Sequence, residues 1–214
     1  MQKIGKIYGK ISAKLPETGT IIALIVLVTI TTIFNPTFLT FENLTTLCKS
    51  IPFIALVTLG SSLCLTSGSL DIACGRVAGL CGMVFGYALT KFGFSLPVAI
   101  LCGVGCGAAF GALHGLLIVY CDMNAFIVTM GTLYVAGGLR YMINNGDPMN
   151  LPESYRNFSQ ATPLGISWLF WIAVAVFVIM GFVESKTVYG RRIYATGSNA
   201  EVAKLQGVNY KLIR

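Results

Sequence analysis

Polar side chains able to do chemistry are rare in the apolar parts of this chain, which makes Asp71 and Arg76 conspicuous. They stand in a stretch rich in Ser and Gly, LTSGSLDIACGR, between two apolar runs. If these runs cross a membrane, the stretch is either a solvated turn or a broken helix that lines a cavity. An ionisable residue at membrane depth costs on the order of 3 kcal/mol on insertion scales, and it usually marks a pathway.

The seven cysteines and the single histidine are the other groups that could bind a metal or act in catalysis. The cysteines lie in or beside apolar stretches and form no CxxC pair. Cys102 and Cys106 are one helical turn apart, but His114 follows two turns later and no carboxylate accompanies them. Buried, reduced cysteines that act as small hydrophobic residues fit this distribution better. We therefore expect no metal site, no cofactor and no catalytic residue.

The composition explains what kind of elements must hold these groups. Hydrophobic residues make up 55% of the 214 residues and charged residues only 11%, whereas a soluble domain has about 25% charged residues. The net charge of +7 does not indicate nucleic-acid binding, because the basic residues flank apolar segments and do not alternate with aromatic ones. The sequence therefore predicts an all-α, polytopic transmembrane bundle that presents apolar surface to membrane lipid.

Six apolar runs are expected to cross the bilayer, each near the ~20 residues that a spanning helix needs. An N-in, C-in topology with six crossings places eleven of the fifteen Lys and Arg residues inside and four outside, as the positive-inside rule requires. Three domains are expected: a basic segment (1–17) that is either an amphipathic helix or a frayed tail, the membrane domain (18–184) and a cytoplasmic segment (185–214). The six runs are Thr20–Phe34, Ile51–Thr66, Ile72–Thr90, Leu96–Tyr120, Ala125–Ile143 and Trp168–Val183.

Small residues recur at helical spacing in the fourth run. Glycine permits close approach of helix backbones, which supplies attraction between helices in lipid. The pattern indicates tight static packing or, alternatively, a surface on which helices slide. Arg140, near the outer end of the fifth run, is expected to extend its side chain to the headgroups. The glycines of the stripe are Gly103, Gly107, Gly111 and Gly115.

The segment after the sixth run is polar and holds six of the fifteen basic residues. Ser198 and Glu201 have the spacing of a capping box at a helix N-terminus, and Gly207 is placed to end the same helix in a left-handed conformation. A helix of about two turns is marginal alone in water, so we expect it to pack on another surface. The residues available for this contact are Val202, Ala203 and Leu205.

This tail resembles the cytoplasmic coupling segment of ribose-type ABC importer permeases over YGRRIYATGSNAEVAKLQGVN, residues 189–209. Three further stretches resemble parts of the same family: LTSGSLDI (65–72), NAFIVTMGT (124–132) and NNGDP (144–148). There are also departures. Ser198 and Ser69 stand in place of glycines, and Arg76 stands where a small residue is usual.

The resemblance implies a permease subunit of an ATP-binding-cassette importer in the bacterial inner membrane, moving a monosaccharide or similar small polar solute. It implies three partners: a cytoplasmic ATPase, an extracytoplasmic sugar-binding protein and a second permease subunit, either identical or a paralogue. The chain has no GxxxxGK[ST] loop of its own. Family members continue beyond the coupling segment, so a fragment or truncated reading frame is implied. A secondary transporter using Asp71 for ion coupling is the alternative.

The resemblance also assigns roles to residues. Those implied to contribute to the translocation pathway are Ser67, Gly68, Asp71, Gly75, Asn124 and Phe126. Those implied to couple the permease to its ATPase are Gly190, Arg191, Arg192, Gly197, Ser198, Asn199, Glu201, Ala203, Leu205 and Gly207.

Overall fold

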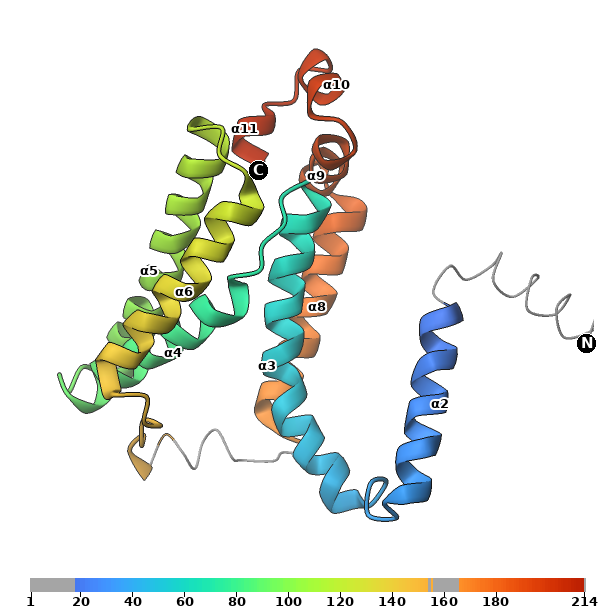
Figure 1. Ribbon diagram of the computed structural model, residues 1–214, viewed down its shortest axis with the longest axis vertical. Coiled ribbons are helices and arrows are strands. Elements are labelled where there is room, and N and C mark those ends of the chain that lie inside the picture. Colours follow the sequence, from blue (N-terminus) through green and yellow to red (C-terminus); the bar gives the residue numbers. More distant parts are fainter. Residues whose placement is uncertain (1–17, 154, 156–165, 214) are drawn as a thin grey trace, which may run out of the picture. The chain divides into compact units, whose positions relative to one another are not determined.

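The computed structural model describes residues 18–153, 155 and 166–213, and every regular element in these ranges is a helix (Figure 1). The expected all-α class is thereby confirmed. The basic segment 1–17 lies outside the described residues. The chain divides into two compact units, residues 1–48 and residues 49–214, and the features that concern function lie in the second.

The first unit holds helix α2 (Thr18–Phe34), a turn and the start of α3 (Phe41–Thr66). Large apolar side chains such as Leu24, Leu27 and Ile33 are more than half exposed along α2, as expected for a helix that faces lipid. The helix ends at Phe34, and Oδ1 of the next residue, Asn35, accepts hydrogen bonds from the Thr37 amide (3.1 Å) and hydroxyl (2.5 Å). This Asx turn satisfies the Thr37 amide just after the helix.

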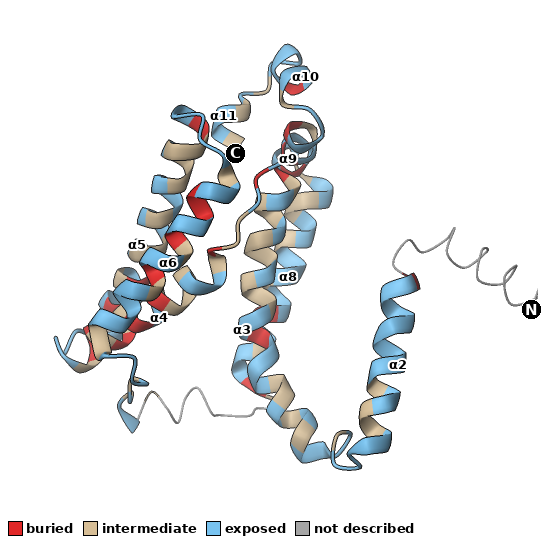
Figure 2. Ribbon diagram, in the orientation of Figure 1, coloured by how far each residue is buried: buried red, intermediate tan, exposed pale blue. Residues whose placement is uncertain are grey.

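The second unit contains the rest of α3, then α4 (Cys74–Thr90), α5 (Leu96–Gly115), the π-helical turn η1 (Leu116–Tyr120) and α6 (Ala125–Asn144). Helix α4 packs on both α5 and α6. Figure 2 shows that most buried residues of these three helices lie where they meet, whereas their outer faces are exposed. A small apolar cluster near the end of α4 is formed by Ala88, Leu89 and Ala99.

The predicted runs and the observed helices agree closely except at α3, which begins ten residues before the run predicted from Ile51. The polar stretch before Ile51 is helical although it contains threonines, whose hydroxyls bond back to carbonyls of the preceding turn. The hydroxyls of Thr45 and Thr46 donate to the carbonyl of Glu42 at 2.8 and 3.0 Å. Pro52 lies inside the helix and is buried. Hydropathy alone underestimates such a helix.

Four helical segments are long and apolar enough to cross a membrane: α3, α5 with η1, α6, and α8 (Trp168–Lys186). Helices α2 and α4 are apolar and 17 residues long, at the lower limit for a span. The chain is thus a multi-pass membrane protein. The count of six crossings and the positions of the termini stay predictions.

Three short helices follow α8: α9 (Val188–Ser198), α10 (Ala200–Leu205) and α11 (Tyr210–Ile213). Helix α10 is the short helix predicted from the tail. Helix α9 was not predicted, because it contains Gly190 and Gly197, and glycine is among the weakest helix formers. Helix α9 packs on α8, α10 and α11, so tertiary contacts outweigh its low intrinsic propensity.

Candidate functional site: an interrupted span and the tail that contacts it

Helix α4 begins partway along α3 rather than beside its end. The Cys74 thiol lies 3.6 Å from the carbonyl oxygen of Val57, and a Cβ added at Gly60 would lie 3.6 Å from the same sulfur. Val57 and Gly60 precede the last residue of α3, Thr66, by nine and six residues. At 1.5 Å per residue, α4 starts about 9–14 Å inside the span of α3.

The segment 67–73 runs back along α3 to reach this depth (Figure 1). Its polar groups are satisfied locally: the Ser67 hydroxyl donates to the Cys64 carbonyl (2.7 Å) and Asp71 Oδ1 accepts from the Ala73 amide (2.8 Å). Across the bundle, the Thr129 hydroxyl of α6 donates to the Leu70 carbonyl (3.4 Å). We call this stretch the interrupted span, because the chain folds back along α3 before α4 begins. The choice between a solvated turn and a broken helix at membrane depth stays a prediction.

The first cavity lies beside the upper part of this segment, between it and the start of α6. Its volume is about 350 Å³. Asn124 Oδ1 accepts from the Phe126 amide (2.9 Å), which caps α6 and holds the cavity wall in place. Three predicted pathway residues, Gly68, Asn124 and Phe126, thus line one space. The other lining residues are Ser69, Leu70, Ile118, Asp122, Met123 and Ala125.

Asp71 lies apart from these residues, in a second cavity of about 250 Å³ between α4 and α5. His114 of α5 lines the same cavity, and its Nε2 is 2.9 Å from the Thr132 hydroxyl of α6. Of the remaining predicted pathway residues, Ser67 is buried, with 4% of its surface exposed. Gly75 faces α3, where an added Cβ would lie 4.0 Å from Val57. Three of the six predicted pathway residues therefore line the first cavity and Asp71 lines the second, whereas Ser67 and Gly75 line neither.

Arg76 and Arg140 meet in the groove between α4 and α6. A Cβ added at Gly137 would lie 3.6 Å from a guanidinium nitrogen of Arg76, and one added at Gly79 would lie 3.5 Å from a guanidinium nitrogen of Arg140. Each arginine therefore lies over a glycine of the other helix. The guanidinium group of Arg140 lies against α4, and its expected extension to the headgroups stays a prediction. Two residues predicted separately are neighbours, which only the packing of α4 on α6 reveals.

The four glycines of the α5 stripe have different neighbours. A Cβ added at Gly103 would lie 3.2 Å from the Cys81 carbonyl oxygen, and one added at Gly107 would lie 3.3 Å from the Cys81 sulfur. These two glycines let α5 approach α4 closely. Gly111 lines the cavity that contains Asp71, and beside Gly115 an added Cβ would meet nothing within 4 Å.

Helix α10 has a specific cap at each end. Asn199 Oδ1 accepts from the amides of Glu201 (3.0 Å) and Val202 (3.1 Å). The predicted capping box is wrong, because Ser198 is the last residue of α9 and Asn199 is the N-cap. Gly207 has φ +79°, as predicted, and the amides of Gly207 and Val208 donate to carbonyls of the last turn in a Schellman motif.

The tail contacts the membrane domain through glycines of α9. A Cβ added at Gly197 would overlap the carbonyl oxygen of Thr66, the last residue of α3. One added at Gly190 would overlap the carbonyl of Glu184 at the end of α8. Thr196, which precedes Gly197, is only 1% exposed. Helix α9 therefore rests directly on the ends of two spans.

The other residues predicted to couple the permease to an ATPase lie on α9 and α10. Arg191 and Arg192 are exposed on α9. On α10, Ala203 is 1% exposed, whereas Leu205 is 87% exposed. Lys211 of α11 lies over the ring of Tyr120, with its Nζ 5.6 Å from the ring centroid, which is a cation–π contact between the tail and η1.

Within residues 18–153, 155 and 166–213 there is no group of three or more His, Cys, Asp or Glu side chains placed to hold a metal ion. The seven cysteines are free thiols. What the described residues offer is a set of cavities beside an interrupted span, a pair of arginines and a capped surface helix.

Comparison with known proteins gives one family. The family model described as "Branched-chain amino acid transport system / permease component" matches residues 43–214. The chain is 32% identical to the autoinducer 2 import system permease protein of Enterobacter sp. (strain 638), over 90% of this chain and 56% of that protein. No solved structure matches it.

Two further relatives come from Escherichia coli (strain K12). The ribose import permease protein is 28% identical over 94% of this chain and 64% of its own length. The L-arabinose transport system permease protein is 31% identical over 90% of this chain and 58% of its own length. The resemblance to ribose-type permeases is confirmed by these matches. The chain spans 56% to 64% of the length of the three relatives.

Proposed function

Because the chain belongs to the family described as the permease component of branched-chain amino acid transport systems, we propose that it is the membrane-spanning subunit of an ATP-binding-cassette importer. The solute is a monosaccharide or similar small polar molecule, since the similar permeases are named for ribose, arabinose and autoinducer 2. The subunit lies in the bacterial inner membrane and pairs with a second permease subunit. A separate cytoplasmic ATPase supplies the energy, and a sugar-binding protein delivers the solute.

The observation that carries this proposal is the surface of α10. A six-residue helix is marginal by itself, yet it is capped at both ends and anchored through buried Ala203. Val202 and Leu205 remain 47% and 87% exposed, although burying a leucine gains about 2 kcal/mol. A rigid helix that keeps apolar side chains outside suits docking into a groove of another protein. We assign that groove to the ATPase.

The contact between α9 and α3 connects α10 to the proposed solute pathway. Helix α10 follows α9 after the single residue Asn199, and Gly197 of α9 lies against the carbonyl of Thr66. Residue 67 begins the interrupted segment, and Gly68 lines the first cavity. Because packed interiors shift as units rather than deform smoothly, displacement of α10 moves the wall of that cavity. The pathway is proposed to pass beside the interrupted segment.

The test is a replacement at the exposed face of α10. In membranes that contain the full-length gene product and the ATPase encoded with it, Leu205→Asp should abolish co-purification of the ATPase and solute-stimulated ATP hydrolysis. Leu212→Asp is the matched control, because Leu212 is also exposed, at 74%, but lies in α11. Normal stimulated hydrolysis by Leu205→Asp would contradict the docking role. Failure of the unmodified protein to bind any such ATPase would contradict the importer.

A further inference from the structure

The arginine pair between α4 and α6 has no electrostatic partner in the described part of the chain. Neither guanidinium group of Arg76 or Arg140 makes an ion pair or hydrogen bond there. Both side chains are exposed. Gly137, beside Arg76, lies about 18 Å along α6 from its first residue and about 10 Å from its last. Arg76 therefore lies beside the middle of a spanning helix, and Arg140 lies about 6 Å from the end of that helix.

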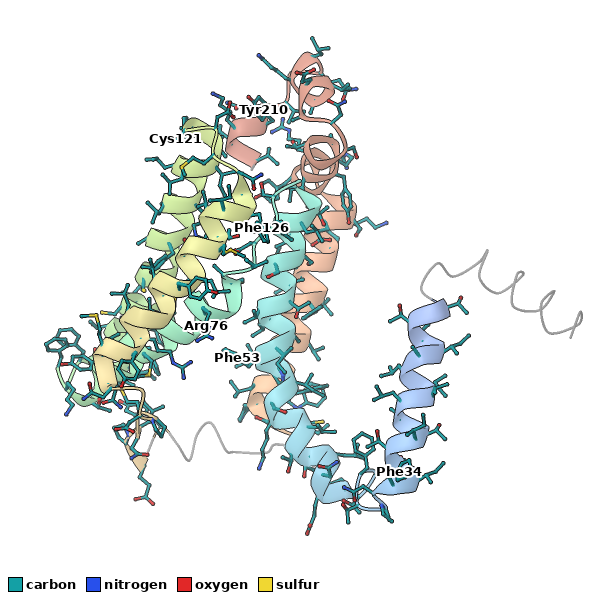
Figure 3. All side chains as sticks on the ribbon, viewed as in Figure 1. Phe34, Phe53, Arg76, Cys121, Phe126 and Tyr210 are labelled. Atoms are coloured by element: carbon teal, nitrogen blue, oxygen red, sulfur yellow. The ribbon has the colours of Figure 1, made fainter. Side chains whose placement is uncertain are left out.

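The start of α4 adds positive potential beside Arg76. Arg76 is in the first turn of α4, whose N-terminus has no side-chain cap and so presents the positive end of the helix dipole. Asp71 is the nearest acidic residue in sequence, but its Oδ1 accepts from the Ala73 amide and it lines the cavity on the α5 side. Figure 3 shows Arg76 in the first turn of α4.

A pair of like charges within a membrane-spanning bundle is unfavourable unless something compensates it, and such residues usually face a water-filled path. The guanidinium groups lie over glycines, so no side chain at those two positions covers them. Levels three residues apart on a helix differ by about 4.5 Å, so both groups can reach one ligand. Guanidinium forks bind carboxylate and phosphate oxygens in pairs.

We propose that Arg76 and Arg140 form a binding site for the anionic group of a solute, a sugar derivative that carries a carboxylate or a phosphate. The proposal rests on the proposed import function and narrows its solute class. A lipid phosphate offers the same chemistry, but it belongs to the headgroup layer, whereas Arg76 lies beside the middle turns of α6. The solute is the occupant to which we commit.

The first test needs no variant. The full-length protein in a neutral maltoside detergent is treated with phenylglyoxal, which modifies water-accessible arginines, and each arginine is followed by mass spectrometry. Arg76 and Arg140 should react, and D-ribonate or D-ribose 5-phosphate should slow their modification at least fivefold, while D-ribose should not. Arg191, exposed in the tail, is the internal control and should react equally with every compound.

Three outcomes would overturn the proposal. If Arg76 and Arg140 do not react with phenylglyoxal in detergent, they are not accessible to water and cannot bind a dissolved solute. Equal rates with charged and neutral sugars would exclude recognition of the charge. Protection by added phosphatidylglycerol, with none by either anionic sugar, would assign the pair to lipid. Comparing ribonate with ribose 5-phosphate separates a carboxylate ligand from a phosphate ligand.

Variants provide a second, independent test. Arg76→Gln and Arg140→Gln should each weaken calorimetric binding of the protecting anion at least tenfold, and Lys91→Gln, which removes an exposed charge just after α4, should not. If a Gln variant fails to fold, anion binding to the unmodified protein is measured at increasing salt instead. The affinity for the anion should fall as chloride is raised from 50 to 500 mM, because salt screens charge. Unchanged affinity would contradict the site.

The two proposals fail in different ways. If the chain is not part of an importer, no ATPase is retained and no solute stimulates hydrolysis, whatever its charge. If only the anion site is wrong, the ATPase is retained, a neutral sugar stimulates hydrolysis, and the Arg76→Gln and Arg140→Gln variants behave as the unmodified protein does.

Discussion

Gly197 of the tail lies against the backbone carbonyl of Thr66, the last residue of α3, with no room between them for a Cβ atom. A Cβ at this position would also lie 3.3 Å from the Gly68 amide nitrogen. The contact joins the two parts of the molecule to which we assign different tasks, the coupling helices and the interrupted span.

Gly197→Ala should force this contact open. Overpacking of this kind costs about 1–3 kcal/mol, so we expect a lower unfolding temperature in detergent and weaker solute-stimulated ATP hydrolysis with the ATPase still bound. The control is Gly181→Ala in α8, where an added Cβ meets nothing within 4 Å and alanine favours the helix. Equal behaviour of the two variants would show that the contact carries neither stability nor coupling.

Asn199→Ala should weaken α10, because it removes the side chain that accepts from two backbone amides. The loss of an N-cap costs about 1 kcal/mol. Hydrogen exchange should accelerate severalfold at the amides of Glu201 and Val202, and ATPase retention should fall. Ser198→Ala should change neither quantity. A larger effect of Ser198→Ala than of Asn199→Ala would restore the capping box that the sequence predicted.

Thr196→Val should be neutral or stabilising. The Thr196 hydroxyl is buried and has no hydrogen-bond partner within the described residues, and such a group costs about 1–3 kcal/mol relative to an apolar one of the same shape. Thermal unfolding in detergent measures the effect. The control is Thr132→Val, because the Thr132 hydroxyl is bonded to the Val128 carbonyl (3.0 Å) and lies 2.9 Å from His114. A clear loss of stability in Thr196→Val would reveal a partner outside these residues.

Asp71→Ala should abolish solute uptake while leaving expression intact, because it removes the acceptor that holds the Ala73 amide at the start of α4. Asp71→Asn keeps an oxygen at that position, so it should retain most of the uptake. Uptake into vesicles measures both. Loss of uptake in Asp71→Asn as well would mean that the negative charge is needed, and full uptake in Asp71→Ala would remove Asp71 from the pathway.

Local patterns predicted the helices well, since apolar runs and a left-handed Gly207 depend on neighbouring residues only. They could not predict the depth at which α4 begins, because the position of Cys74 beside Val57 depends on packing between helices. For the same reason, the sequence predicted that Asp71 and Gly68 belong to one site, although in the structure they line two different cavities. Arg76 and Arg140, 64 positions apart in the sequence, gave no signal of their proximity.

Helix α9 was missed for a related reason. Gly190 and Gly197 lower its helix propensity, yet both are needed because the helix lies against Glu184 and Thr66 without intervening side chains. The two glycines that lower the helix propensity of α9 are the same residues that let it lie directly against α3 and α8. Two glycines seven positions apart on one helix face would have been the available signal.

The interrupted span also sets the order in which this protein can assemble. Segment 67–73 emerges from the ribosome well before α6, yet the carbonyl of Leu70 relies on Thr129 of α6 for a hydrogen bond. A backbone group without such a bond is strongly disfavoured in hydrocarbon. We therefore expect α4 to settle at its final depth only after α6 has entered the bilayer, so that insertion and folding are separate events for this helix.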